Sequence, residues 1–324
     1  MFHDLYAGDL PLFSLNFGVI TLIPKVQEAN LIQQYRPIYL LNTSFKIFTK
    51  VATNRLNSMA DHVISLTQTT FMRGRNILEG VVILHETVHE LHQKKQSGVN
   101  LEIDFQKAYD KVKWPFLFQI LRMKGFSPKW INWVKTFISG GSIAINVNDD
   151  VGHFFKTRKG LRQGDPLSPL LFNIVAHMLA ILMNRAKVDG QISGVVPHLI
   201  DIGLSILQYA DDTILFMDHD LEKARNMKLL LSVFEQVSGL KINFHKSELF
   251  CFGNAQDHLD QYVELFGCKS GDFPIWYLGI PIHFRKLRNV ERRKVEECFE
   301  RQLDSWKGKH LSIGGHSNID KLCA

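Results

Sequence analysis

The sequence has few cysteines, no export signal and no long apolar run. Its four cysteines form no C-x-x-C pair and lie far apart, at Cys251, Cys268, Cys298 and Cys323. This spacing predicts neither a disulfide framework nor a zinc knuckle, and it suits a reducing compartment. The first ten residues, MFHDLYAGDL, carry acids where a signal peptide needs basic residues. The longest apolar stretch, Leu170 to Met183, is shorter than a membrane span and contains Asn173 and His177.

Repeats, low-complexity tracts and Pro/Gly/Ser-rich linkers are also absent, which predicts that any subdomains pack closely together. With 324 residues, of which 45% are apolar and 22% charged, the chain can bury a core shared by two or three subdomains. Thirty-eight Lys and Arg face 32 Asp and Glu, and the formal charge of +6 favours an anionic partner. We therefore expect a soluble intracellular protein without a membrane segment.

Apolar periodicity predicts a series of helices. Between Asn76 and Lys95, apolar residues recur at three- and four-residue steps, at Ile77, Val81, Leu84, Val88 and Leu91. Further helices are predicted from Trp114 to about Gly125, Pro128 to Ile138, Leu167 to Lys187 and Leu221 to Val237.

Two strand patterns end in acidic residues. In VNLEIDF, apolar side chains alternate with Asn100, Glu102 and Asp104, so Asp104 points away from the core. The stretch around YADD is too long for one strand. Two strands meeting at 210–212 form a hairpin with its acids at the tip.

Other strand patterns complete the chain. SIAINV and HFFKTR predict a hairpin around Asn148 and Asp149, while KINF, SELFCF and YLGIPI predict strands near the C-terminal side. From 99 to 252 the order is then strand, helix, hairpin insertion, helix, two strands, helix, strand. This order predicts an α+β fold with a ferredoxin-like split βαβ sheet. In such a sheet Asp104 and Asp211 meet, although 107 positions separate them.

Two converging carboxylates indicate a metal site. Neighbouring carboxylates repel each other, so an exposed acidic pair is stable mainly when a hard cation neutralises it. Magnesium is the natural candidate, because carboxylate and phosphate oxygens complete its octahedral shell. Two such ions about 4 Å apart activate an attacking hydroxyl and stabilise a leaving pyrophosphate. The pattern predicts nucleotidyl transfer.

Eight blocks in order give the chain a resemblance to a known family. They are ITLIPK (20–25), YRPIYLLN (35–42), QTTFMRGRN (68–76), IDFQKAYD (103–110), GLRQGDPLSPLLFN (160–173), YADD (209–212), SGLKINFHKS (238–247) and YLGIPI (277–282). The chain resembles the reverse transcriptase of a plant LINE-type, non-LTR retrotransposon. Several ordered blocks are far more specific than any single one.

The resemblance implies a right-hand polymerase, whose palm is the split βαβ sheet. Fingers would occupy 1–96, the palm 97–283 with a fingers hairpin near 140–160, and a partial thumb or connection 284–324. The implied activity is RNA-directed DNA polymerase, with an RNA template, a DNA primer and dNTPs as partners; protein partners stay unknown. Asp104 and Asp211 would hold two Mg²⁺ ions, and Asp212 would assist or order the hairpin.

The resemblance also implies substrate-binding roles. Tyr109 would exclude a ribose 2′-OH, although a core aromatic is the plainer interpretation. Gln163 and Gly164 would lie against the template and incoming nucleotide, where glycine permits close backbone approach.

Basic residues would bind the triphosphate. Arg36 would grip it, since Arg suits bidentate phosphate contacts, and Lys25 and Arg75 would join the same basic wall. Either Lys241 or Lys246 would protonate the leaving pyrophosphate. A solvated surface charge or a structural salt bridge is the competing role for each.

Two other functions compete with this one. His85-Glu86-Thr87-Val88-His89 matches the H-E-x-x-H pattern of zinc metallohydrolases, with His85 and His89 as ligands and Glu86 as general base. A third ligand is missing from the pattern, because His92 stands where the extended motif needs Gly. The second rival is a catalytically inactive, nucleic-acid-binding relic of a retroelement.

One basic run and nearby aromatics remain open. RKLRNVERRK, 285–294, fits a phosphate-binding thumb surface, a nuclear import signal or a solvated helix face equally. Trp276, Tyr277 and Trp306 would either stack on bases or pack in the core.

Overall fold

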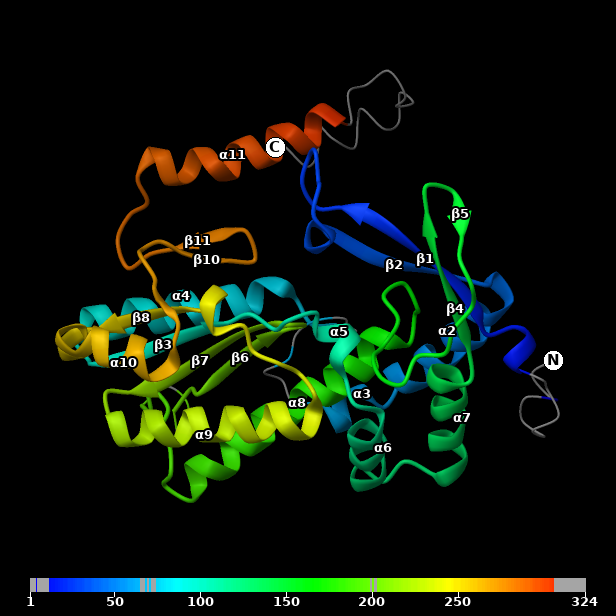
Figure 1. Cartoon of the computed structure of the whole chain (residues 1–324). Coiled ribbons are helices and arrows are strands. Elements are labelled where there is room, and N and C mark those ends of the chain that lie inside the picture. Colours follow the sequence, from blue (N-terminus) through cyan, green and yellow to red (C-terminus); the bar gives the residue numbers. More distant parts are fainter. Residues whose placement is uncertain are drawn as a thin grey trace.

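The chain folds into two lobes joined by long helices, as seen in the computed structural model (Figure 1). The structure describes residue 4 and residues 12–64, 68, 70, 74–198, 200 and 203–305. Within these residues the strands form a five-stranded, a four-stranded and a two-stranded sheet. The predicted α+β class is confirmed.

The five-stranded sheet has the order β6-β7-β3-β8-β9. Its strands are β3 (Gly98–Ile103), β6 (Ile206–Tyr209), β7 (Asp212–Asp218), β8 (Glu248–Phe252) and β9 (Lys269–Ser270). β3 pairs antiparallel with both β7 and β8, and β6 pairs antiparallel with β7. The first four strands have the order of a split βαβ sheet, as the alternation pattern predicts.

Both faces of this sheet are buried (Figure 1). On one side Val99, Leu101 and Ile103 pack in the main core under α6 (Trp114–Met123), α8 (Ser168–Val188) and α9 (Leu221–Ser238). On the other, a second core joins the sheet to α4 (Ile77–Gln93) and to the hairpin of β10 (Ile275–Tyr277) and β11 (Ile280–Ile282).

The polar face of β3 is partly covered by the second core. Asn100 lies opposite Phe216 and Phe250, which are buried in the second core, and Asn100 is itself 1% exposed. The polar residues of β3 therefore do not all face solvent. Asp104, just beyond the strand, is exposed as predicted.

The four-stranded sheet lies in the other lobe and has the order β2-β1-β4-β5. Its strands are β1 (Phe17–Pro24), β2 (Tyr35–Leu41), β4 (Ser142–Val147) and β5 (Asp150–Val151). β1 pairs antiparallel with β2 and parallel with β4. The turn between β4 and β5 is the predicted one, with positive φ at Asn148 and Asp149. The strand predicted for HFFKTR is wrong, because the second strand of the hairpin is β5 and only Phe155 of that segment forms a bridge with a described residue, Ile143.

Only one face of the four-stranded sheet packs on the core. Ile20, Tyr39, Leu41 and Ile143 belong to the main core, with α2 (Thr43–Asn57), α3 (Ala60–Val63) and α7 (Pro128–Ser139) nearby in the chain. The alternate residues face the other way, and several are largely exposed: Phe17, Ile23, Arg36 and Leu40. Several apolar side chains are therefore exposed on this open face.

Local sequence signals set the helix ends. Ser127 accepts a hydrogen bond from the Trp130 amide and Pro128 opens α7. Gly239, with φ of 82°, ends α9 where the sequence predicts a stop. The periodic segments predicted as helices are all confirmed.

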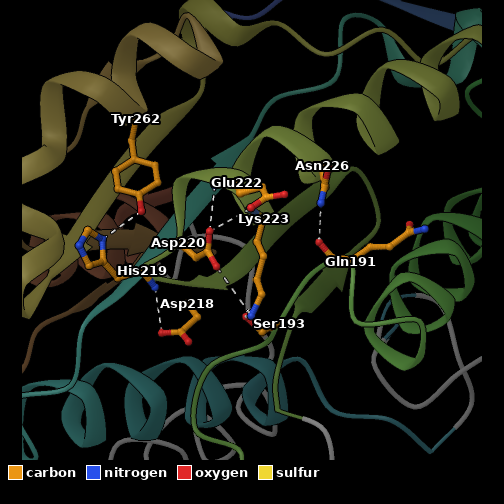
Figure 2. A network of polar contacts seen from close by, with 9 residues as sticks. All are labelled: Gln191, Ser193, Asp218, His219, Asp220, Glu222, Lys223, Asn226 and Tyr262. Carbon is orange, nitrogen blue, oxygen red and sulfur yellow. Dashed lines mark hydrogen bonds and ion pairs between the residues drawn. The ribbon is translucent and has the colours of Figure 1, made fainter.

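A polar network anchors the end of β7 that lies away from the acidic hairpin (Figure 2). Asp220 caps α9 by accepting hydrogen bonds from the Glu222 and Lys223 amides at 2.9 and 3.2 Å. Lys223 Nζ donates to Ser193 Oγ at 3.3 Å, and His219 Nδ1 lies 3.0 Å from the Tyr262 hydroxyl. This end of β7 is thus fixed.

α8 is the central helix of the fold. It is long and apolar enough to cross a membrane by length and composition, and 72% of its most apolar window is buried inside the protein. Cys251 and Cys268 are free and buried beside the five-stranded sheet, and burial raises the pKa of their thiols to about 12 and about 11.

The strand predicted for KINF is wrong. Ile242 forms only an isolated bridge with Phe105, and Phe244–Lys246 is a 3-10 helix. The Gln106 amide donates to Lys241 O at 2.8 Å and the Asn243 amide to Asp104 O at 2.7 Å. These backbone hydrogen bonds hold residues 104–106 in place, and the KINF segment does not add a strand to the sheet.

The C-terminal region is described as far as α11 (Asn289–Ser305). Trp306, proposed for base stacking, lies outside the described residues, as does much of the QTTFMRGRN block. Tyr277 is 1% exposed and belongs to the second core, whereas Trp276 is 37% exposed.

Candidate functional site

The predicted acids meet where β3 ends and the β6–β7 hairpin turns. Ile103 lies opposite Thr213, so Asp104 comes level with Asp212, the first residue of β7. Asp211 is at the tip, after Ala210 with φ of 55°. All three carboxylates are exposed. The sheet register therefore brings together the residues that the sequence predicts to converge.

The backbone of Asp104 is held on both sides. Its amide donates to Ser247 Oγ at 3.2 Å, and its carbonyl accepts from the Asn243 amide at 2.7 Å. Ser247 is buried and donates to Asn243 O at 3.0 Å. The segment predicted as KINF thus positions the Asp104 side chain.

The hairpin tip is also supported. Gln68 Oε1 accepts from the Ala210 amide at 3.2 Å, and Gln68 forms a bridge with Gln208 of β6. Gln68 is fully buried. A segment that precedes α4 in the chain therefore fixes the position of Asp211.

Two pockets share Asp104 and Lys246. The first, which we call the basic pocket, has a volume of about 590 Å³. It is lined by five basic residues and three acids: Lys25, Arg36, Lys107, Lys111, Lys246, Asp104, Asp110 and Asp211. A pocket of this charge suits a polyanion bound with metal ions.

The second, the acidic pocket, has a volume of about 550 Å³. It is lined by five carboxylates together with Lys246 and Trp276: Glu102, Asp104, Asp212, Glu248 and Asp272. Burial, then Asp211 and Asp104, raise the pKa of Asp212 to about 6. Burial, then the facing Glu248 and Asp212, raise the pKa of Glu102 to about 7. Negative charge is therefore concentrated on this side.

Tyr109 lies between the core and the basic pocket. Its ring stacks on Phe172 with centroids 4.7 Å apart, and burial followed by Asp211 raises the pKa of its hydroxyl. Tyr109 also lines the pocket beside Asp211. The packing role and the pocket role therefore belong to the same side chain.

Gln163 lines the wall of the basic pocket near β2, and Gly164 follows it in the chain. Gln163 O accepts from the Tyr39 amide at 2.8 Å. Gly164 has φ of 106°, and a Cβ there would come within 2.9 Å of Tyr39 O. Only glycine fits this close approach without strain. Both residues line a small side pocket with Arg36, Tyr109 and Asp211.

The predicted basic residues divide into two groups. Lys25, Arg36 and Lys246 line the basic pocket. Lys241 does not line either pocket that contains Asp104, among the residues that the structure describes. Arg75 donates to the carbonyls of Gln68 and Ile64, so it supports the segment behind the hairpin.

Sequence analysis missed two charged residues at this site, the half-buried Asp110 and the buried Arg162. Asp110 lines the basic pocket, burial raises the pKa of its carboxyl, and its Oδ1 has no hydrogen-bond partner among the described residues. Arg162 lies next to Gln163 and is 6% exposed. Both stand inside predicted blocks, but single charged letters in a sequence do not reveal burial.

The residues of the zinc pattern lie on the exposed side of α4. His85 and His89 stack with ring centroids 6.4 Å apart, and His85 Nδ1 is 3.6 Å from Glu86 Oε1. His92 stacks on Phe284. Across the described part of the chain, no group of three or more His, Cys, Asp or Glu side chains is placed to hold a metal ion. Among these residues the H-E-x-x-H pattern therefore finds no third ligand.

The comparisons with known proteins agree with this geometry. Residues 23–282 match the family model described as reverse transcriptase (RNA-dependent DNA polymerase). The chain belongs to this family. It is therefore related to nucleotidyltransferases that copy RNA into DNA, and the H-E-x-x-H alternative is not supported.

Several proteins of mobile elements are similar to this reverse transcriptase domain. A transposon TX1 uncharacterized 149 kDa protein of Xenopus laevis is 29% identical over 96% of the chain and 24% of its own length. A Pol polyprotein from the type-2 retrotransposable element R2DM of Drosophila melanogaster is 26% identical over 75% of the chain and 22% of its own length. The chain spans about a quarter of these curated relatives.

The fold is shared with a solved polymerase. A telomerase of Candida tropicalis, solved with a fragment of telomeric RNA, aligns with 88% of this chain and 48% of its own, at a TM-score of 0.52 and 13% identity. The five-stranded and four-stranded sheets are consistent with the palm and fingers that the sequence predicts.

Proposed function

We propose that this domain extends a DNA primer on an RNA template by adding dNTPs to the primer 3′-OH. The observation that carries the proposal is the meeting of Asp104 and Asp211 in one pocket with five basic side chains. The primer hydroxyl would attack the α-phosphate in line, and pyrophosphate would leave.

Asp104 and Asp211 are the proposed ligands of two Mg²⁺ ions, with Asp212 ordering the hairpin. Mg²⁺ usually takes one or two protein carboxylates and completes its shell with water and substrate phosphates, so two exposed carboxylates in an open pocket fit. When bound, the ions would activate the primer hydroxyl and neutralise charge on the leaving pyrophosphate.

The basic pocket supplies the proposed triphosphate site. Arg36 lies on β2 and makes no ion pair with a described residue, so its guanidinium is available for phosphate. Lys25, Lys107 and Lys111 add positive charge to the same wall. Lys246 is the better candidate for the lysine that protonates pyrophosphate, because it lines both pockets beside Asp104 whereas Lys241 lines neither.

Tyr109 is proposed as the residue that selects deoxynucleotides. Its ring is fixed by stacking on Phe172 and lines the pocket beside Asp211. A fixed ring at this place would clash with a ribose 2′-OH while leaving room for a deoxyribose.

The open face of the four-stranded sheet supports a nucleic-acid template. Phe17 and Leu40 are 42% and 54% exposed there, on the same face as Arg36, which lines the basic pocket. Exposed apolar side chains beside a phosphate-binding arginine suit unpaired bases and their backbone. We therefore propose that the RNA template approaches along this face.

A LINE-type, non-LTR retrotransposon is the proposed source of the domain. The similarity to transposon TX1 and R2DM proteins supports this, and a plant host is supported by 42% identity over 55 residues to an uncharacterized mitochondrial protein of Arabidopsis thaliana. Nuclear import through the basic run 285–294 would suit such an element; within that run Arg288 is paired with Glu291 at 2.8 Å.

Primer extension tests the proposal directly. Purified domain is given poly(rA)/oligo(dT), labelled dTTP and Mg²⁺, with an EDTA sample as control. Incorporation that needs Mg²⁺ and dTTP supports the proposed function. Failure to incorporate, together with salt-sensitive binding of the same duplex, would instead favour the inactive relic.

A further inference from the structure

Arg162 is a buried cation at the junction of the two lobes. Its side chain is 6% exposed, although arginine is almost never fully buried without a function or a partner. It stands in the loop before α8, directly before Gln163. The nearby Asp165 carboxylate, also buried, supplies negative charge.

Three segments of the four-stranded lobe surround the guanidinium. Nη1 donates to Asn16 Oδ1, just before β1. The guanidinium carbon lies 5.8 Å from the ring centroid of Phe45 in α2. Nη2 fills the space that a Cβ would take at Gly141, between α7 and β4. One side chain thus reaches the residue before β1, α2 and the α7–β4 turn.

The asparagine that receives Arg162 is itself fixed. Asn16 Nδ2 donates to the carbonyls of Thr136 and Phe137 at 3.1 and 3.0 Å, and Asn16 O accepts from the Ser142 amide at 3.0 Å. Arg162 therefore reaches a rigid corner of the lobe that carries Arg36.

The backbone beside Arg162 forms the nucleotide wall. Gln163 and Gly164 line the side pocket with Arg36 and Asp211, and Arg162 lines it too. Arg162 Nε is buried and has no hydrogen-bond partner among the described residues. Leaving a buried donor unpaired is unfavourable, so stability alone does not explain this arginine.

We propose that Arg162 is a positioning residue for the incoming nucleotide: it sets the Gln163–Gly164 wall against the Arg36-bearing sheet by joining Asn16 and Gly141. This inference rests on the proposed function. The Gln163–Gly164 wall and Arg36 would then move as one unit, at a fixed distance from Asp211.

Two variants disturb this joint in different ways. Arg162→Lys keeps the charge and loses the fork that reaches Asn16 and Gly141. Gly141→Ala leaves Arg162 in the sequence and places a methyl group where Arg162 Nη2, Asn16 O and Asn16 Oδ1 now meet, so it disturbs the joint from the Gly141 side. Gly152→Ala, in the same lobe, is the matched control, because a Cβ there has its nearest contact at 3.6 Å.

Steady-state kinetics with active-site titration measures the effect on nucleotide use. We expect KM for dTTP to rise about tenfold in Arg162→Lys and Gly141→Ala, with kcat per active site changed less than about threefold. Gly152→Ala should match the wild type. A merely structural role would lower the active fraction and leave KM unchanged, which would overturn the proposal.

Hydrogen exchange separates this inference from the proposed function. The Tyr39 amide bonds to Gln163 O, so its protection reports the joint without any catalysis. Protection should fall in Arg162→Lys and Gly141→Ala, relative to Gly152→Ala. Unchanged protection refutes the role of Arg162, even in an active enzyme, whereas a wild type that incorporates no nucleotide refutes the proposed function alone.

Discussion

The two pockets beside Asp104 differ in charge although they share two residues. The basic pocket has five cationic side chains against three acids, and the acidic pocket has five carboxylates and one lysine. A free triphosphate is attracted to the first and repelled by the second. The sheet edge therefore separates a mainly positive side, where we propose that the nucleotide binds, from a negative side that favours a metal-bound or protonated group.

The largest effect is expected from replacing Asp211, a proposed ligand of both metal ions. Asp211→Ala should lower incorporation at least about 10³-fold, because the substrate charge would lose its metal bridge. Asp272→Ala, an exposed acid of the acidic pocket, should change it less than about threefold. Primer extension with both variants at equal folded concentration makes the measurement. Equal losses of incorporation in the two variants would show that the two pockets do not differ in function.

Replacing Lys246, the lysine that lines both pockets, should give the next largest effect. Lys246→Ala should lower kcat about 10²-fold, as expected when a general acid is removed, while Lys241→Ala should lower it less than about threefold. Single-turnover incorporation at saturating dTTP measures both. The reverse order would show that Lys241, and not the lysine between the two pockets, serves the reaction.

A smaller effect is expected at the sugar. Tyr109→Ala should raise GTP incorporation relative to dGTP about tenfold or more, because the ring that lines the basic pocket is removed. Phe172→Leu is the control, since it loosens the stack without opening space at Tyr109. If both variants lose stability and keep their sugar preference, Tyr109 is a core aromatic only.

The acidic pocket should also affect stability. The Glu102 carboxyl has its pKa raised from 4.5 to about 7, so the folded chain holds this proton more tightly than the unfolded chain. The protonated Glu102 carboxyl therefore stabilises the folded protein fully below about pH 4.5, and this stabilisation is lost as the pH rises through 7. Glu102→Gln should therefore raise the free energy of unfolding at pH 8 by about 1–3 kcal/mol and have little effect at pH 4.5.

Urea unfolding in EDTA at both pH values measures this difference. Glu264→Gln, an exposed glutamate on α10 (Leu259–Phe266), is the matched control and should change neither value appreciably. If the free energy of unfolding depends on pH in the same way for Glu102→Gln and the wild type, the pKa of the Glu102 carboxyl is not raised in the folded protein.

Periodicity and turn chemistry predicted much of the palm from sequence. The helix at 76–95, the YADD hairpin and the β4–β5 turn follow from local patterns, and the convergence of Asp104 and Asp211 follows from strand order. KINF failed because its alternation matches a strand, whereas its backbone groups bind Asp104 and Gln106.

Long-range pairing could not be predicted in the same way. β1 pairs parallel with β4, more than 100 residues away, and no local signal marks that contact. The role of Arg162 depends on this pairing, because Asn16 and Gly141 meet only when β1 and β4 are neighbours. The predicted subdomain boundaries at 96 and 283 stay predictions.

The two buried thiols make optical studies of this domain practical. Cys251 and Cys268 are covered and hold their protons, so a maleimide dye would react with them slowly. With Cys298 and Cys323 replaced by serine, a single cysteine introduced at the exposed Phe154 would carry a fluorophore at a defined place. Its emission would then report the surroundings of the segment that follows β5.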